Sequence, residues 1–224
     1  MSIFATAILI TTAILALGAA LIIIPIRKKP QRKWVYFVTI GPGIILTLIG
    51  VIAVLGVFQA QTELRALDAD VQEHIDKPAP ELAFTTLGEE QEMRISDYRG
   101  QTVMINFWAT WCPPCIEEMP DLSELADAYS DELVILCLSD EDAETVESWV
   151  SETPGLNQKI GLVDKADIKA PFNQMFAVRP ATFILDEEGV VREYIRGSRN
   201  YEEFEEYMVP HLSGDQEELT EVAE

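Results

Sequence analysis

The sequence is poor in the residues from which metal sites and nucleic-acid surfaces are built. The 224 residues include only 3 cysteines and 2 histidines, and no acidic residue precedes Glu63. A structural zinc site takes four Cys or His ligands at short spacings, so this scarcity argues against one. Residues 63–224 contain 11 basic and 38 acidic residues, a formal charge of −27. Because nucleic-acid binding needs clustered Lys and Arg, this part of the chain disfavours it.

Two long segments near the N-terminus lack charged side chains. Residues 2–26 and 34–58 each exceed the ~20 residues that cross a bilayer as a helix. No Lys or Arg precedes Arg27 and the first apolar run is too long for a cleavable signal peptide, so we expect this run to be retained. The sequence therefore predicts a transmembrane hairpin over residues 1–59. Neither span contains an ionisable residue, which favours an anchor over a proton or ion relay.

The short loop between the two predicted spans is basic. It contains Arg27, Lys28, Lys29, Arg32 and Lys33. The positive-inside bias places such a loop in the cytoplasm. The chain after about Gln59 is then expected on the periplasmic or extracellular side of the cell (inner) membrane. The sequence thus predicts a two-pass protein with the lipid bilayer as one of its partners.

The remainder of the chain divides into three parts by composition. Residues 60–77 are polar with scattered Leu and Val, which is typical of a short helical stalk, and Lys77-Pro78-Ala79-Pro80 marks its end. Residues 78–212 contain the patterns of a folded domain. Residues 213–224 are acidic with little to bury, and are predicted to be a disordered tail.

Strand and helix patterns alternate along residues 78–212. Strands are predicted at 81–86, 91–95, 102–108, 133–138, 159–163, 181–186 and 190–195. Helices are predicted at 112–129, 142–152, 167–175 and 201–212. The continuous apolar run at 102–108 is typical of a buried central strand. This order predicts an α/β fold with a mixed sheet that helices cover on both faces.

Cys112 and Cys115 are three positions apart, where the predicted central strand is followed by a helix. The first turn of a helix presents unpaired N–H groups and partial positive charge, which lower the pKa of a cysteine placed there. Pro113 and Pro114 suit this position, because the first turn could not use their missing N–H groups. The pattern predicts a redox pair in which Cys112 attacks and Cys115 resolves the mixed disulfide.

Two structural roles compete with redox chemistry for this pair. A zinc site would need further ligands, and the chain offers only Cys137, His74 and His211 at unsuitable spacings. A static disulfide that closes so short a loop would stabilise the fold little. We therefore favour the redox interpretation and expect no metal and no other cofactor. Cys137, inside an apolar strand, is expected to be a buried free thiol.

Glu118 lies at the border of the apolar stripe of the predicted helix. It follows Cys115 by three positions and precedes Leu122 by four. A partly buried carboxylate has a raised pKa and could take the proton of Cys115, as general base of the resolving step. The alternative is a solvated first-turn glutamate that interacts only with the helix dipole. Helical phase alone does not choose between the two.

Two sequence motifs occur in order within residues 78–212. The first is Asn106-Phe107-Trp108-Ala109-Thr110-Trp111-Cys112-Pro113-Pro114-Cys115, followed by Glu118 and Pro120. The second is Arg179-Pro180-Ala181-Thr182-Phe183-Ile184-Leu185-Asp186. Together they resemble the membrane-anchored thioredoxin-like thiol:disulfide oxidoreductases of the TlpA/ResA family. The resemblance implies a thioredoxin-like mixed sheet flanked by helices.

The resemblance also implies roles for residues beside the cysteine pair. In the family, the proline that matches Pro180 is cis and lies against the cysteines, and Arg179 would border the substrate groove. The same groove would be shaped by Trp111, Pro113 and Pro114. The family's acid at the position of Glu118 is buried near the thiols, which favours the catalytic interpretation of this residue.

Two features depart from the family pattern. Members are commonly anchored by a single helix or a lipid, whereas two spans are predicted here. The residue after the cis-proline is usually Thr, and here it is Ala181.

The sequence thus predicts a membrane-tethered thiol:disulfide oxidoreductase. Following the resemblance, we expect it to reduce disulfides of exported proteins, with apocytochrome c as a candidate, and to be fed by a membrane thiol-electron carrier. One alternative is a peroxiredoxin-like peroxide reductase, although Cys112 has no Arg in its loop. Another is a non-catalytic, membrane-anchored interaction module whose disulfide is structural.

Overall fold

The computed structural model describes residues 13, 16, 33–88 and 92–212. The chain divides into two compact units, residues 1–68 and 69–224. Apart from positions 13 and 16, the predicted first span at 2–26 lies outside the described residues. The basic loop up to Arg32 and the predicted acidic tail lie outside them as well.

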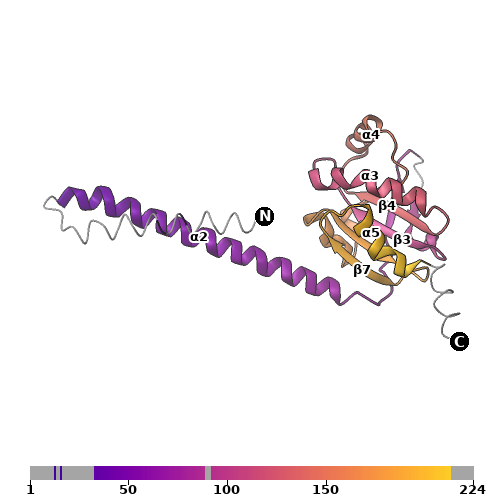
Figure 1. The fold of residues 1–224 in the computed structure, drawn as a ribbon, viewed down its shortest axis with the longest axis horizontal. Coiled ribbons are helices and arrows are strands. Elements are labelled where there is room, and N and C mark those ends of the chain that lie inside the picture. Colours follow the sequence, from indigo (N-terminus) through magenta and orange to yellow (C-terminus); the bar gives the residue numbers. More distant parts are fainter. Residues whose placement is uncertain (1–12, 14–15, 17–32, 89–91, 213–224) are drawn as a thin grey trace. The chain divides into compact units, whose positions relative to one another are not determined.

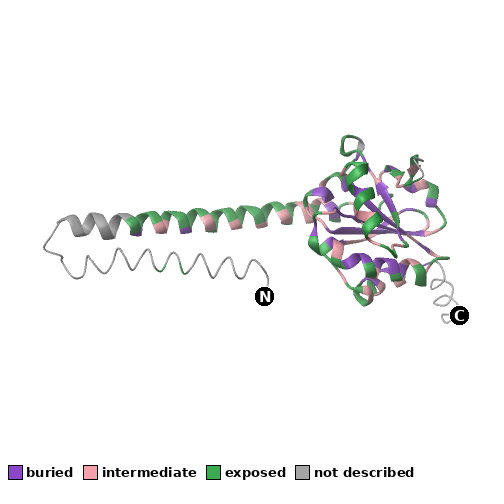
Figure 2. Cartoon of the chain, turned by 90° about the horizontal axis from the view of Figure 1, so that it is seen from above, coloured by how far each residue is buried: buried purple, intermediate pink, exposed green. Residues whose placement is uncertain are grey.

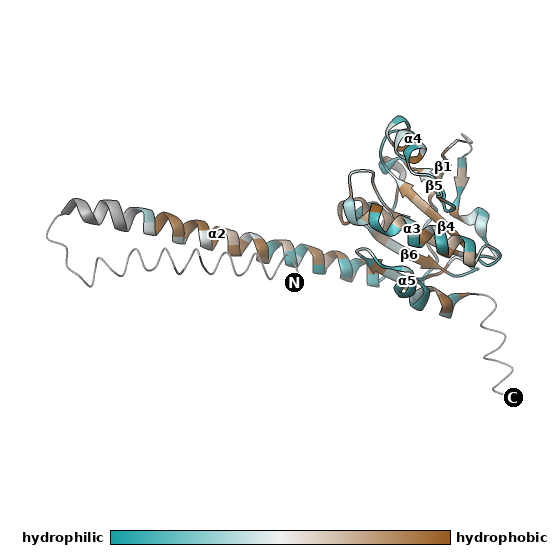
Figure 3. Ribbon diagram, turned by 45° about the horizontal axis from the view of Figure 1, so that its top comes forward, coloured by the Kyte–Doolittle hydropathy of each residue, from teal (hydrophilic) through white to brown (hydrophobic). Residues whose placement is uncertain are grey.

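One long helix, α2, runs from Lys33 to Gln72 and contains both the predicted second span and most of the predicted stalk (Figure 1). Its part from Pro42 onward is, within the described chain, the one helix long and apolar enough to cross a membrane. Residues 60–72 of the predicted stalk therefore continue this helix. Apolar residues colour the middle of this helix in Figure 3, and Figure 2 shows that helix largely exposed. The exposed large side chains there are Ile44, Ile45, Leu48, Ile49, Val51, Ile52, Val54, Leu55 and Phe58.

The second unit, residues 69–224, begins upstream of the proline pair that the composition suggested as its boundary. Val71 is fully buried. Asp70 accepts a hydrogen bond of 2.6 Å from Nε2 of Gln174. These contacts join the end of the predicted stalk to the folded unit, and they depend on residues that are distant in sequence.

A mixed sheet forms the centre of this unit, and its described strands follow the order β2-β1-β5-β4-β3-β6-β7. The strands are β1 Ala83–Thr86, β2 Glu92–Arg94, β3 Thr102–Phe107, β4 Leu133–Ser139, β5 Lys159–Leu162, β6 Ala181–Leu185 and β7 Val191–Arg196. Strands β3, β4 and β5 are parallel, whereas β1, β2, β6 and β7 pair antiparallel with their neighbours. Every residue of β3 is buried, which confirms the predicted central strand.

Three α-helices follow strands of this sheet. They are α3 Pro113–Ala128, α4 Ala143–Glu152 and α5 Tyr201–Met208. Helices α3 and α5 contact each other and lie over the same face of the sheet (Figure 1). Leu122 of α3, Val146 of α4 and Phe204 of α5 share one buried cluster with Met104 and Trp108.

The opposite face of the sheet carries a cluster of aromatic rings. Side chains alternate along a strand, so Phe107 faces away from Met104 and Trp108. Its ring centroid lies 5.8 Å from that of Phe172 and 5.0 Å from that of Phe176. The two faces together confirm a mixed sheet that is covered on both sides.

The covering of this second face differs from the prediction. Instead of an α-helix at 167–175, the chain forms the 3₁₀ helices η2 Lys165–Asp167 and η3 Phe172–Ala177. Pro171 lies between them, and a proline neither donates an N–H nor leaves the preceding residue free to be helical. Two further 3₁₀ helices are η1 Ile95–Tyr98 and η4 Val209–His211.

The last predicted helix, 201–212, is also shorter than expected. Helix α5 ends at Met208, and the chain continues as the 3₁₀ helix η4. Pro210 lies in this segment and cannot donate the N–H that another α-helical turn would need.

Candidate active site

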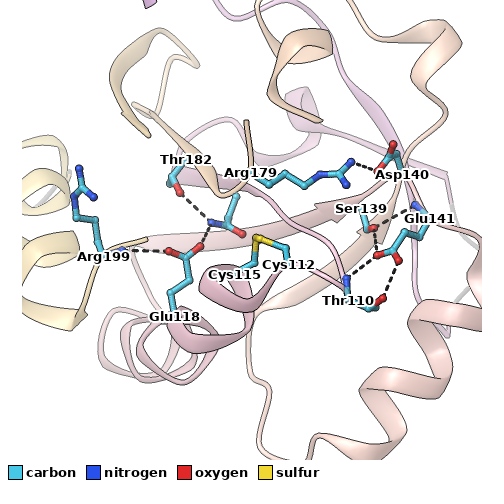
Figure 4. The surroundings of a disulfide bond; sticks show 11 residues. Thr110, Cys112, Cys115, Glu118, Ser139, Asp140, Glu141, Arg179, Thr182 and Arg199 are labelled. Atoms are coloured by element: carbon cyan, nitrogen blue, oxygen red, sulfur yellow. Dashed lines mark hydrogen bonds and ion pairs between the residues drawn. A yellow bond between two sulfur atoms is a disulfide. The ribbon is translucent and has the colours of Figure 1, made fainter. Parts of the chain in front are cut away.

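Cys112 and Cys115 form a disulfide at the start of α3 (Figure 4). Cys112 is the N-cap residue, and its carbonyl oxygen accepts hydrogen bonds from the N–H groups of Cys115 at 3.0 Å and Ile116 at 3.1 Å. Pro113 and Pro114 occupy the first two helical positions, as expected. Cys112 keeps 4% of its surface exposed, whereas Cys115 has none. Of the two cysteines, therefore, only Cys112 can be reached from solvent, and only over a small part of its surface.

Glu141 holds the loop that leads into the disulfide. Its carboxylate accepts from the N–H of Thr110 at 2.7 Å and from the Thr110 hydroxyl at 2.8 Å. The hydroxyl of Ser139 donates to the same carboxylate at 3.1 Å. The sequence interpretation missed Glu141. Its signal was the position just after β4, because the carboxyl ends of the parallel strands β3 and β4 lie at the same edge of the sheet.

Trp111 and Arg179 stack beside the disulfide. The indole of Trp111 is 66% exposed, and the guanidinium carbon of Arg179 lies 5.4 Å from its ring centroid. Arg179 also lies 5.0 Å from the ring of Phe176 and forms an ion pair with Asp140. Its side chain is only 4% exposed. Arg179 therefore packs beneath the exposed ring of Trp111 and is itself shielded from solvent. Asp140 is a second residue that the sequence interpretation missed.

Pro180 is buried, and its peptide bond with Arg179 is cis, as the resemblance implied. The next residue, Ala181, pairs with Phe107 at the end of β3. This pairing places the start of β6 beside the end of the strand that leads to Cys112. The structure thus brings the two predicted motifs together, although more than sixty residues separate them in sequence.

Glu118 is buried on α3 with 1% of its surface exposed, so the solvated alternative is wrong. Its Oε1 accepts from Nδ2 of Asn106 at 2.8 Å, and its Oε2 accepts from the N–H of Arg199 at 3.2 Å. Burial raises the pKa of Glu118 from 4.5 to about 7, while these hydrogen bonds oppose the rise. Near neutral pH this carboxyl group can therefore both accept and release a proton.

Cys137 lies in the interior of β4 with no exposed surface. Burial raises the pKa of its thiol well above 9, and the nearby charge of Glu118 raises it further. A thiol in this environment stays protonated and unreactive. The position agrees with the prediction of a buried free cysteine.

The sequence matches known families in its second unit. Residues 75–194, more than half of the chain, match the profile of the AhpC/TSA family. The chain is 37% identical over 131 residues to the thioredoxin-like protein YneN of Bacillus subtilis, which covers 57% of this chain and 75% of YneN. It is 34% identical over 136 residues to the thiol-disulfide oxidoreductase ResA of Geobacillus kaustophilus, which covers 60% of this chain and 76% of ResA.

A solved structure shows the same fold. The thioredoxin domain of a thiol-disulfide oxidoreductase from Bacteroides vulgatus aligns with a TM-score of 0.50 at 20% sequence identity. The alignment covers 60% of this chain and 97% of that domain. The described sheet with its flanking helices is therefore a thioredoxin-like fold.

Proposed function

From the premise that this chain belongs to the thioredoxin-like proteins of the TlpA/ResA type, within the AhpC/TSA family, we propose that Cys112 and Cys115 are its redox-active pair. The chain is a thiol-disulfide oxidoreductase. One observation carries the assignment of the pair: the two residues form a disulfide at the start of α3, and only Cys112 retains exposed surface. Cys112 is then the attacking sulfur and Cys115 the resolving one.

The proposed cycle starts from the reduced pair. The thiolate of Cys112 attacks a substrate disulfide, so that a mixed disulfide forms and one substrate sulfur leaves as a thiolate. Cys115 then gives its proton to Glu118 and attacks Sγ of Cys112. This breaks the mixed disulfide and releases the second substrate sulfur. Two electrons pass to the substrate, and the protein is left with the Cys112–Cys115 disulfide seen in the structure.

The substrate groove in this proposal lies between the cysteine loop and the start of β6. The exposed ring of Trp111 lies beside Cys112, and the cis-proline Pro180 directly precedes the start of the neighbouring strand β6. Arg179 holds the ring of Trp111 in position, because its ion pair with Asp140 fixes the guanidinium that lies over that ring. Pro113 and Pro114 stiffen the turn that presents Cys112.

The proposed substrates are disulfides of exported proteins, with apocytochrome c as a specific candidate. The proposed electron donor is a thiol carrier in the membrane. The resemblance to the TlpA/ResA type motivates both proposals, and the apolar helix α2 supports a membrane tether.

Trapping with Cys115→Ser tests this function. Without the resolving thiol, Cys112 should remain joined to its substrate, so a protein adduct that disappears on reduction should accumulate in cells. The matched control is Cys112→Ser, which should trap nothing. Mass spectrometry of the adduct identifies the substrate. If Cys115→Ser forms no more adduct than Cys112→Ser, the proposed roles of the two cysteines are wrong.

Peroxide reduction is a second candidate function, because the AhpC/TSA profile matches residues 75–194. It would require a cationic group free to act at the reacting thiol. The guanidinium of Arg179 is instead paired with Asp140 and stacked on Trp111. Peroxide consumption that depends on Cys112, with no activity on protein disulfides, would favour this candidate over the first.

A further inference from the structure

Asn106 lies in β3, and its side-chain amide is enclosed between two oxygen atoms. Its Nδ2 atom donates to Oε1 of Glu118 at 2.8 Å and to Oγ1 of Thr182 at 3.0 Å. The residue is fully buried. Its Oδ1 atom is also buried, and among the described residues it has no hydrogen-bond partner. The amide nitrogen therefore makes two hydrogen bonds, whereas the amide oxygen makes none among the described residues.

The register of the sheet explains this arrangement. Asn106 lies opposite Cys137 of β4 and opposite Thr182 of β6, so the three side chains project from one face. Glu118 reaches this row from α3. The N–H of Arg199, in the loop between β7 and α5, closes the other side of the carboxyl group. The carboxyl group is thus enclosed by groups from separate elements.

A buried carboxyl group needs different partners in its two protonation states. The carboxylate of Glu118 only accepts, and Nδ2 of Asn106 supplies the donor. The protonated group carries an O–H that needs an acceptor. A half turn of the Asn106 amide exchanges Oδ1 and Nδ2, so that Oδ1 can accept from the carboxyl O–H and from the hydroxyl of Thr182. After this turn Oδ1 has two donors, and Nδ2 takes the position in which Oδ1 has no hydrogen-bond partner among the described residues.

We propose that Asn106 is a positioning residue of the resolving step, because its amide can match the carboxyl group of Glu118 before and after that group takes a proton. This inference rests on the proposed function. When Cys115 attacks Sγ of Cys112, the Cys115 proton passes to Glu118, the intramolecular S–S bond forms and the substrate leaves as a thiolate. The amide then turns, and it turns back when Glu118 passes the proton to solvent.

Other groups around Glu118 also act on its charge. Burial is the main reason why its pKa rises to about 7, and the hydrogen bond from Asn106 is the largest effect in the opposite direction. Arg199 also lowers this pKa, through its backbone N–H and its charge, whereas Asp121 on α3 raises it. Cys137 on β4 faces Glu118 with a thiol that burial keeps protonated. Removal of the Asn106 amide should therefore change the pH range of the resolving step.

The test separates the two steps of disulfide exchange in the full chain, held in detergent micelles. The reduced protein is mixed with dithiobis-nitrobenzoate, an aromatic disulfide that releases a coloured thiolate. One equivalent leaves when Cys112 attacks the reagent, and a second leaves when Cys115 resolves the mixed disulfide. Cys115→Ser identifies the second phase, because it should release only the first equivalent. The rate of the second phase is then measured as a function of pH.

In the wild type, the second phase should rise with pH through an inflection near the pKa of Glu118, about 7. Asn106→Leu preserves the volume but removes the amide. The carboxylate then loses a charge-assisted hydrogen bond and the protonated group only a neutral one, so the inflection should move up by about one pH unit. At pH 7 this slows the second phase about fivefold. Asn106→Asp adds a negative charge and should move the inflection further. The control is Glu117→Gln, an exposed position on α3, which should leave the inflection unchanged.

An inflection in Asn106→Leu that coincides with the wild type overturns the inference, whatever the variant does to stability. If Asn106→Leu does not fold, Asn106→Ser is measured under the same criterion. A wild-type protein that shows no first phase overturns the proposed function itself, so the two failures are distinguishable.

Discussion

At the scale of single residues, two opposing effects set the protonation of Glu118. Burial disfavours its charge, and the donors of Asn106 and Arg199 favour it. Burial is the larger effect, so the pKa rises to about 7. The cysteine pair is thus accompanied by a carboxyl group that changes its protonation near neutral pH, the property that a general base for Cys115 needs.

This raised pKa predicts a pH-dependent stability. The folded protein binds the Glu118 proton more tightly than the unfolded chain, in which the pKa is 4.5. The proton therefore stabilises the fold fully below pH 4.5, and this contribution is lost as the pH rises through about 7. For a shift of this size the loss is about 3 kcal/mol. Glu118→Gln should remove it.

Thermal unfolding of the oxidised protein at pH 5 and pH 8 measures this effect. The unfolding temperature should fall more between the two pH values in the wild type than in Glu118→Gln. Glu117→Gln, which changes an exposed carboxylate on the same helix, should behave like the wild type. Equal pH dependence in all three proteins would mean that the carboxyl group of Glu118 titrates normally.

At the scale of elements, the site is built where the ends of β3 and β4 lie near the start of β6. Parallel pairing of β3 with β4 brings Glu141 to the loop before Cys112, and antiparallel pairing of β3 with β6 brings Pro180 there. Local patterns predicted these strands well, because each has a continuous buried run. The covering segment at 167–175 was predicted wrongly as an α-helix, because Pro171 interrupts it and leaves two short 3₁₀ helices.

Because Glu141 bonds both polar groups of Thr110, we predict that the loop before Cys112 depends on this one side chain for its conformation. Glu141→Ala removes the acceptor for both the N–H and the hydroxyl of Thr110, and should cost about 1–3 kcal/mol of stability. Disulfide exchange at Cys112 should also slow several-fold, because the loop that presents it loses its support. Denaturant unfolding and the first phase of thiolate release measure the two effects.

Glu147→Ala is the matched control for this change, since Glu147 is exposed on α4. It should alter neither stability nor exchange measurably. If Glu141→Ala and Glu147→Ala unfold at the same denaturant concentration, the hydrogen bonds of Glu141 contribute nothing to the loop.

At the scale of the whole molecule, charge and hydropathy divide the chain. Residues 1–62 carry five basic and no acidic residues, whereas residues 63–224 carry the formal charge of −27. The exposed apolar side chains of α2 are unfavourable in water and suit a lipid environment. We therefore propose a two-pass anchor with the thioredoxin-like domain on the periplasmic or extracellular side.

Cysteine labelling tests this topology in a Cys112→Ser, Cys115→Ser background. In intact cells, a membrane-impermeant maleimide should label Ala223→Cys, near the C-terminus. It should label Gln31→Cys, in the basic loop, only after the cells are permeabilised. Labelling of Gln31→Cys but not of Ala223→Cys in intact cells would reverse the proposed orientation.

The sequence alone predicted the cysteine pair at a helix start, the order of the strands with helices α3, α4 and α5, and a long apolar helix, because each depends on residues that are neighbours along the chain. Only the tertiary structure decided the burial of Glu118 and its contact with Asn106, and it alone revealed Glu141 and Asp140. These contacts join positions that the pairing of strands brings together across the sheet. Helical phase placed Glu118 between the apolar and the polar face of the predicted helix. Packing of α3 against the sheet then buried this side chain.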